Sequence, residues 1–414
     1  MRNASHIFED DLSARTRAGK RWQVVFLAAT ILAIISLTLL LINILNSVFG
    51  FVVLDSKVDP ATLFFDGNPL EDQSSDQLIG VLKMNLSSGA FNKLEKEKSF
   101  AQRDRAEIYQ LVEERVLKVE VLESWSLLDS IFKQEEVKAE YQTLLETHPN
   151  AELKFISWLT RQRLVRPQTS EVMTTGIRTA ILGSLWTIFI TILFAFPVGV
   201  GAAIYLEEYA RENWLNRIIQ TNINNLAGVP SIIYGILGLA IFVRTLEPLT
   251  SGAVFGVVDP LTANGRTVLS AGLTLGLLIL PLIIINSQEA IRAVPQSLRN
   301  AGYGLGATKW QVIKAHVLPN AMPGVLTGTI LAISRAIGET APLVVVGAST
   351  AISFDPTSPF SKFTTLPIQI YQWTARPQAE WQHVAGAAIL VLLVLLLGLN
   401  AVAILMRNRL SHKY

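Results

Sequence analysis

Long runs of apolar residues alternate with polar stretches along the chain, and six of the runs are long enough to cross a lipid bilayer. A transmembrane helix needs about 20 mostly apolar residues. The runs that meet this requirement cover residues 24–48, 179–206, 226–243, 268–286, 321–348 and 384–406. The first run is too long for a secretory signal and has no small-residue cleavage site, so we expect it to remain as an anchor.

Composition agrees with a membrane protein that carries a polar insert. Half of the 414 residues are hydrophobic, 16% are charged and the mean hydropathy is +0.39, a balance that is unusual for a soluble globular protein. The chain has no cysteine, which excludes disulfides and thiolate metal sites, and its five histidines are scattered. We therefore expect neither a metal site nor zinc enzyme chemistry.

Lysine and arginine in short segments indicate how the spans are oriented. Six spans place the basic N-terminal tail (1–23), the loop 207–221, the loop 288–320 and the basic C-terminal tail (407–414) on one side of the membrane. The basic residues of the tails are Arg2, Arg15, Arg17, Lys20, Arg21, Arg407, Arg409 and Lys413. The two short loops on the other side carry fewer, so we expect both termini in the cytoplasm and the chain in a bacterial inner membrane.

A polar stretch, residues 50–173, separates the first span from the second. Long segments are translocated largely regardless of charge, so this stretch predicts an extracytoplasmic domain. Residues 51–58 (FVVLDSKV) predict a short strand, and residues 101–164 predict helices, because apolar residues recur there at three-to-four spacing. We expect a mainly helical domain that braces or orients a complex. A ligand site is the alternative, and no motif supports it.

The second block, residues 174–406, holds the other five spans and is rich in glycine. GxxxG spacing occurs at Gly272 and Gly276 and again at Gly324 and Gly328. Small residues at this spacing let helices approach closely in lipid. We interpret them as sites of bundle packing rather than of gating.

Within this block, the polar segment 289–324 predicts a helix–turn–helix. Pro295 is suited to start the first helix, and a second, residues 309–317, follows an N-cap at Thr308 and is expected to end before Pro319. The first helix is broken by Gly302, Gly304 and Gly306, and the side chains offered to a partner are Tyr303, Leu305 and Trp310. The segment is expected to lie against the cytoplasmic face.

The same segment resembles the coupling motif of ABC importer permeases: Glu-Ala-Ala, three residues, Gly, nine residues, Ile-x-Leu-Pro. The matching positions are Asn300, Ala301, Gly302, Gly306, His316, Leu318 and Pro319. Asn300 replaces the glutamate, Gly302 the second alanine and His316 the isoleucine. The resemblance implies that these residues, with Trp310, dock into a groove on an ATPase subunit and transmit closure of the ATPase dimer.

Three further stretches, RAVPQSLRNAGYGLGATKWQVI, ISRAIGETAPLVVVGA and AGVPSIIYGILGLAIFV, are similar to phosphate-importer permeases of the PstA type. The similarity covers about residues 174–406. It implies an α-helical permease that works in the lipid membrane with a sister permease, two ATPase subunits and a periplasmic phosphate-binding protein, and that binds no nucleic acid. The chain has no GxxxxGK[ST] motif, so we expect a transporter subunit rather than an enzyme, with no cofactor of its own and with ATP used by its partners.

Two charged residues, Arg335 and Glu339, lie inside the fifth predicted span, four residues apart and so on one helix face. Leaving a charge in hydrocarbon costs about 3 kcal/mol, so we expect both to face the bundle interior or a wet path. The planar guanidinium of Arg335 suits phosphate oxygens, and Glu339 would hold and then release it. The alternative is a structural pair that only fixes helix packing.

Other polar residues lie near the ends of spans. Thr340 follows the charged pair, and Arg244 ends the third span, where snorkelling to the interface is as good an interpretation as guidance of an anion. Glu289 and Arg292, at the end of the fourth span, are expected to form a solvated or lipid-facing pair.

Alternative functions remain open. The cargo could be another oxyanion such as sulfate or molybdate, against which only the GETAP-type stretch and Arg335 argue. A membrane-anchored ligand sensor would need a cytoplasmic signalling domain, and both tails are short. A secondary transporter is disfavoured by the coupling loop and by the lack of a visible repeat.

Overall fold

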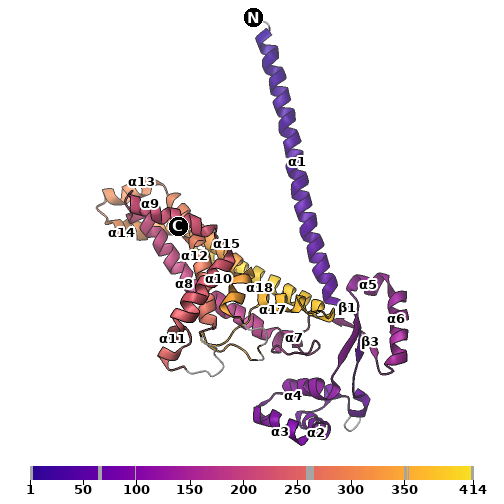
Figure 1. Cartoon of the computed structure of the whole chain (residues 1–414). Coiled ribbons are helices and arrows are strands. Elements are labelled where there is room, and N and C mark those ends of the chain that lie inside the picture. The colour runs from indigo at the N-terminus through magenta and orange to yellow at the C-terminus, as the bar shows by residue number, and fades with distance from the viewer. Residues whose placement is uncertain are drawn as a thin grey trace.

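The computed structural model describes residues 3–63, 68–97, 99–257, 265–348, 352 and 354–411. Arg2 and Lys413, which were counted in the charge pattern, lie outside the described residues. Five helices of the described part are long and apolar enough to cross a membrane. They are α1 (Asn3–Val48), α8 (Arg178–Ile204), α12 (Val268–Arg292), α15 (Leu318–Gly338) and α18 (Glu380–Ser411). Four of them form a bundle, whereas α1 stands apart from it over most of its length (Figure 1).

The third predicted span, residues 226–243, is not a straight helix. α9 (Trp214–Ala227) and the helix Ser231–Thr245, which consists of α10 (Ser231–Gly238) and the π-helical η6 (Leu239–Thr245), meet at 108°. Pro230 lies at the bend, where it has no N–H to donate and disfavours a helical conformation in the residue before it. The Tyr234 hydroxyl donates a hydrogen bond to the Leu226 carbonyl across the bend at 2.7 Å. The third predicted span thus belongs to a bent pair of helices, which brings the candidate spans of the described residues to six if the pair counts as one.

The fifth predicted span, residues 321–348, is also interrupted. α15 ends at Gly338, Glu339 is extended with ψ 125°, and the short α16 (Ala341–Val346) follows. Pro342 has no N–H for a helical bond to the Gly338 carbonyl, so a continuous helix would lose a bond there. Both Arg335 and Glu339 therefore lie at a helix end rather than in the middle of a span.

At its other end, α15 is longer than predicted, because Pro319 does not end the preceding helix. α14 (Lys309–Val312), the π-turn η8 (Ile313–Val317) and α15 form one helical segment, Lys309–Gly338, of 30 residues. A proline ring normally clashes with the carbonyl four residues earlier, here that of Ala315. The wider π-turn at that place accommodates the ring and keeps the segment helical.

The helix α12 lies between α8 and α15 and forms the centre of the bundle. There is no room for a side chain at Gly272 or Gly328. A Cβ added at Gly272 would lie 2.6 Å from Ile190 Cβ of α8, and one added at Gly328 would lie 2.3 Å from Asn286 Cβ of α12. Gly276 and Gly324 make similarly close contacts with the same two helices. The predicted packing role of both GxxxG pairs is confirmed.

The insert between α1 and α8 contains a sheet as well as helices. β1 (Phe49–Asp55) is the centre of an antiparallel sheet of order β2–β1–β3, in which Val52 lies opposite Ser124 of β2 (Glu120–Ser124) and Lys154 of β3 (Glu152–Ser157). The strand predicted at residues 51–58 is confirmed, and β1 begins two residues earlier and ends three residues earlier than predicted. The helical prediction for residues 101–164 misses β2 and β3, because short edge strands are ordered by pairing with β1 rather than by local propensity.

The helices of the insert are α2 (Ser75–Asn85), α3 (Ser88–Glu97), α4 (Arg105–Val112), α5 (Leu127–Phe132), α6 (Gln134–Thr147) and α7 (Arg161–Val165). The shorter turns are η1 (Pro60–Leu63), η2 (Leu70–Asp72), η3 (Phe100–Gln102) and the π-helical η4 (Glu113–Leu117). Outside the insert, three further short helical elements follow α8: the π-helical η5 (Tyr205–Tyr209), α11 (Glu247–Thr250) and the 3-10 turn η7 (Ala253–Phe255). α2 and α4 pack over an apolar core of their own, which includes Leu78, Leu82, Ile108 and Val112.

The insert is attached to one end of the bundle, where it contacts α8, α17 (Leu366–Thr374) and α18. The buried Trp158 stacks on His383 of α18 with ring centroids 5.5 Å apart, and Arg163 lies 5.4 Å from the Trp158 ring. His383 Nδ1 is 2.7 Å from the Ser47 carbonyl at the end of α1. These contacts connect the first helix, the insert and the last helix at one point.

Substituting Gly183 in α8 tests the packing of the bundle. A Cβ there would lie 2.0 Å from the Thr364 carbonyl oxygen, and the backbone cannot give way cheaply. We expect Gly183→Ala to lower the free energy of unfolding by about 1–3 kcal/mol, the usual cost of overpacking. Gly201→Ala in the same helix is the control, because nothing lies within 4 Å of its Cβ position. Denaturant unfolding of the purified chain, followed by tryptophan fluorescence, measures both, and equal stability of the two variants contradicts the prediction.

Candidate functional site

The predicted coupling residues lie together at the end of the bundle that is farther from the insert (Figure 1). α13 (Gln296–Gly304) begins after Pro295, as predicted, and α14 begins after Thr308, whose side chain accepts a hydrogen bond from the Gln311 N–H in a capping box. Between the two helices, Gly306 has a φ of +78°, a conformation that glycine adopts at little cost. The predicted helix–turn–helix is therefore present. The expectation that Gly302 and Gly304 break the first helix is wrong, because α13 continues through both of them and ends before Gly306.

The side chains of this helix–turn–helix divide into an exposed tip and a buried base. Leu305 is 89% exposed and Trp310 is 53% exposed, and Tyr303, Asn300, Ala301 and His316 are exposed as well. Leu318 and Pro319 are half-buried at the start of α15. Gly302 is buried, and a Cβ there would lie 2.8 Å from Val312 Cγ2. Glycine in place of the motif's alanine thus lets α13 pack closely on the helix that follows it.

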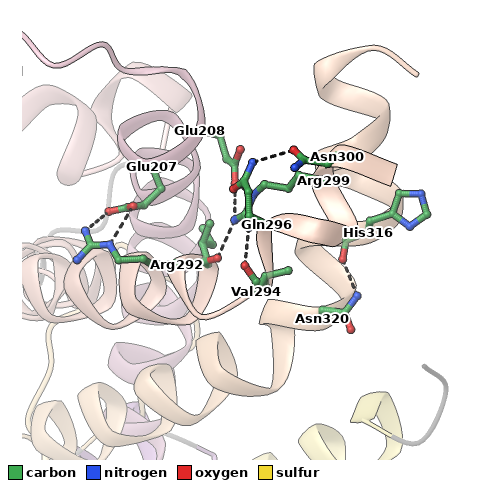
Figure 2. Close-up of polar contacts among 10 residues, drawn as sticks. Glu207, Glu208, Arg292, Val294, Gln296, Arg299, Asn300, His316 and Asn320 are labelled. Carbon is green, nitrogen blue, oxygen red and sulfur yellow. Dashed lines mark hydrogen bonds and ion pairs between the residues drawn. The ribbon is translucent and has the colours of Figure 1, made fainter. Parts of the chain in front are cut away.

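Two ion pairs hold α13 and the end of α12 against η5, the turn that follows α8 (Figure 2). Arg299 Nη2 lies 2.9 Å from Glu208 Oε1, and only 9% and 7% of the two side chains are exposed. The Arg299 guanidinium also donates to the carbonyls of Ile291 and Val294. This cation is buried but has a counter-ion and carbonyl acceptors, which is what makes a buried charge tolerable.

The second pair corrects an expectation. Arg292, which was expected to pair with Glu289, has its Nη2 2.6 Å from Glu207 Oε1 instead. Arg292 is 69% exposed and Glu207 16%, so the cation of this pair is mostly solvated. Nearby, the Lys309 ammonium of α14 lies 5.2 Å from the Tyr209 ring of η5. The roles of Glu207, Glu208 and Arg299 were not predicted from the sequence. Two adjacent acidic residues after an apolar run could have indicated ion pairs there, but the local sequence does not show which basic residues are their partners.

A second region of interest is the break after α15. Arg335 Nε lies 3.4 Å from Glu339 Oε1, as the spacing of four predicts. Glu339 is 18% exposed, but the Arg335 side chain is 45% exposed on the outer surface of this chain. Arg335 therefore does not face the interior of its own bundle, and the other expectation, that it faces a wet path, stays a prediction.

The half-helices next to this break pack against each other. Gly235 of α10 lies against Pro342 of α16, where a Cβ would be 2.7 Å from Pro342 Cα. Thr340 is half-buried at the start of α16. Arg244 is exposed in the last turn of η6, nine residues beyond Gly235 along the same helix and so about 14 Å from it. The structure therefore brings Arg335, Glu339 and Thr340 together and leaves Arg244 apart.

The insert contains a cavity of about 1290 Å³ between its helical part and its sheet. Glu113 and Arg166 pair beside it at 3.1 Å. Burial raises the pKa of Glu113, and Arg166 partly offsets this effect. Burial also raises the pKa of Tyr109 to about 12 and, with the charge of Arg166, lowers the pKa of Arg163 to about 10. Acidic and basic side chains line the cavity in similar numbers, so its lining has no strong excess of either charge.

Comparison with known families agrees with this arrangement of helices. Residues 195–414, just over half of the chain, match the model of the binding-protein-dependent transport system inner membrane component. The chain belongs to this family. The match includes the helix–turn–helix and both helix breaks, whereas the insert lies outside it. The chain is therefore a multi-pass membrane permease subunit of an ABC importer.

Individual relatives narrow the resemblance. The permease is 35% identical to the phosphate transport system permease protein PstA of Yersinia pestis over 55% of its own length and 71% of that protein. It is 33% identical to the probable ABC transporter permease protein YqgI of Bacillus subtilis, over 55% of its own length and 76% of that protein. Among solved structures, it is similar to a chain of the inward-facing MetNI methionine ABC transporter, with 20% identity, 59% of this chain and 99% of that chain covered, and a TM-score of 0.40. The predicted resemblance to PstA-type permeases is confirmed.

The two acids of η5 provide a matched test of the ion pairs. Glu208→Ala leaves the buried Arg299 without its counter-ion, and we expect the free energy of unfolding to fall by about 3–5 kcal/mol. Glu207→Ala is the control: its partner Arg292 is mostly solvated, and exposed pairs contribute about 1 kcal/mol or less. Denaturant unfolding in detergent compares them. Equal losses would show that Arg299 does not depend on Glu208.

Proposed function

We propose that this permease imports inorganic phosphate as one of two transmembrane subunits that work with an ATPase dimer and a periplasmic phosphate-binding protein. The observation that carries the proposal is the Arg335–Glu339 pair at a helix break, in a chain that is 35% identical to a PstA protein. Charged residues at membrane depth are costly and mark substrate paths more often than not. No other arginine of the described residues is paired in this way at an interrupted span.

The exposure of Arg335 defines its part in this mechanism. A guanidinium that is 45% exposed on the surface of one subunit lies in lipid unless something covers it. We place a sister permease on this face, so that Arg335 lines the path between the two subunits. Its planar fork of N–H donors matches the oxygens of a tetrahedral oxyanion. Glu339 holds the fork while the path is empty, Thr340 adds a hydroxyl at the same break, and the phosphate replaces the carboxylate as it passes.

Coupling to ATP hydrolysis is proposed for the opposite end of the same helical segment. Leu305 and Trp310 form an exposed apolar tip, which suits insertion into a groove on an ATPase subunit. Because Lys309–Gly338 continues through Pro319, the docking end and Arg335 belong to one segment of 30 residues, about 45 Å long. A movement of the tip would therefore reach Arg335 without a hinge between them. Arg299 and Glu208 would carry the same movement to the end of α8.

The proposed docking to an ATPase also implies an orientation in the membrane. The docking tip must face the cytoplasm, where ATP is. The insert lies at the other end of the bundle (Figure 1), so we place it outside the inner membrane, with both termini in the cytoplasm. This placement agrees with the excess of lysine and arginine in the tails and in the loop 288–320.

Substitutions of Arg335 test the path. In the complete transporter reconstituted in liposomes, we expect Arg335→Lys to lower phosphate uptake about tenfold or more, because a charge-assisted hydrogen bond contributes about 1.5–3 kcal/mol. Arg335→Gln removes both charge and fork and should abolish uptake with near-normal assembly. The double variant Arg335→Gln, Glu339→Gln is the control for a purely structural pair.

The outcomes separate the alternatives. A structural pair predicts that the double variant restores both assembly and transport, whereas a path residue is not rescued. Uptake of labelled phosphate, with sulfate and molybdate as competitors, also identifies the cargo. Rescued uptake in the double variant would remove Arg335 from the path, and preferential uptake of sulfate or molybdate would replace phosphate as the cargo.

Gly306 tests the docking. Its φ of +78° disfavours a β-branched residue, although no atom lies within 4 Å of a Cβ there. We expect Gly306→Val to remove the stimulation of ATPase activity by loaded binding protein, with normal membrane insertion. Gly306→Asn, which tolerates this conformation, should keep most of the stimulation, as should Gly304→Val, where the space is equally open and the backbone helical. Normal coupling in Gly306→Val would falsify the docking assignment.

A further inference from the structure

The short helix α5 of the insert presents three exposed apolar side chains. Leu128 is 45% exposed, Ile131 52% and Phe132 79%. Positions three and four apart lie on one helix face, so the three form a single apolar surface. Exposure of one phenylalanine and two aliphatic side chains next to each other is unfavourable in water. Contiguous exposed apolar patches mark interaction sites.

The orientation of this face is fixed from the opposite side of the helix. Ser130 is buried, and its hydroxyl accepts a hydrogen bond from the Phe51 N–H of β1 at 2.9 Å and donates to the Ser126 carbonyl. Ser126 also caps the helix by accepting from the Asp129 N–H. Because one face is held against the central strand, α5 cannot rotate to bury its apolar face in the insert.

The position of α5 indicates what covers that face. The Leu128 N–H donates a hydrogen bond to Asn46 Oδ1 at 2.7 Å, and Asn46 lies in the last turn of the spanning segment Gly19–Val48. The exposed apolar surface of α1 continues to Leu45, directly before this contact. Figure 1 shows α5 beside the end of α1. The N-terminal end of α5, with Leu128, thus lies beside the end of the apolar surface that α1 exposes.

We propose that α5 lies in the interface of the bilayer, with Leu128, Ile131 and Phe132 inserted among the lipid headgroups and the first acyl carbons. The Asp129–Lys133 pair, 3.2 Å apart and partly exposed, flanks this face with the mixed charge that a headgroup layer accommodates. A zwitterionic bilayer surface is the occupant, since exposed acids follow at the start of α6 and disfavour an anionic one. The contact adds a second point at which the insert is held to the membrane, next to the end of α1.

The absence of cysteine in the chain allows this to be measured at single positions. The full-length chain is prepared with one cysteine at a time, Phe132→Cys, Ile131→Cys or the exposed control Glu136→Cys, labelled with a nitroxide and placed in phosphatidylcholine nanodiscs. Collision with dissolved oxygen and with a water-soluble nickel chelate is then recorded. We expect oxygen to dominate at positions 131 and 132, giving a positive depth parameter, and the nickel chelate to dominate at position 136.

Two results would overturn the proposal. Dominance of the nickel chelate at positions 131 and 132 would place α5 in water. Protection of both positions from both reagents only after the sister permease and the ATPase subunits are added would show that a protein covers the face. Because the experiment measures depth and not transport, either result leaves the proposed phosphate import unaffected, and loss of phosphate uptake in the Arg335 variants leaves the position of α5 unaffected.

Discussion

In the hydrocarbon of a bilayer, backbone N–H and C=O groups have no water to bond, so a helix can be interrupted only where protein surrounds the interruption or where it lines a water-filled path. The core of this permease follows from that constraint. The breaks before Pro230 and at Glu339 free backbone groups, and the two half-helices that result, α10 and α16, pack against each other and against α12. Gly235 makes the approach possible, because any side chain there would collide with Pro342.

The bundle provides the closely packed environment that these breaks need. α12 lies between α8 and α15, and the glycines at both contacts allow the backbones to approach within the reach of a single methyl group. The same helices end in the region of the exposed helix–turn–helix, where the buried Arg299–Glu208 pair joins α13 to the end of α8. Moving α13 away from η5 would leave both buried charges without a counter-ion, so the pair holds α13 in its position. The packing of the core and the position of the docking tip are thus parts of one arrangement.

The insert is a separate addition to this core, with its own sheet and its own apolar cluster. Its contacts with the core converge on Trp158, which stacks on His383 of the last helix, while His383 contacts the end of the first. α1 stands apart from the bundle over most of its length and contacts α18 near its own C-terminal end (Figure 1). The first helix is therefore held to the other spans both through the insert and by its own contact with α18. The bracing role expected for the insert stays a prediction.

The sequence by itself determined the membrane class, the approximate positions of the spans, and the helix–turn–helix with its capping residue Thr308, because these depend on local hydrophobicity and local hydrogen bonds. It also identified the family from motif residues such as Gly306, Leu318 and Pro319. Only the tertiary structure decided which prolines interrupt a helix: Pro230 does, at a sharp bend, and Pro319 does not, because a π-turn absorbs its ring. It also decided the partners of Arg292 and Arg299 and the exposure of Arg335. The ion-pair partners lie about 90 positions away in the sequence, and the exposure of Arg335 depends on which surfaces the packed helices leave uncovered. A local sequence pattern contains neither kind of information.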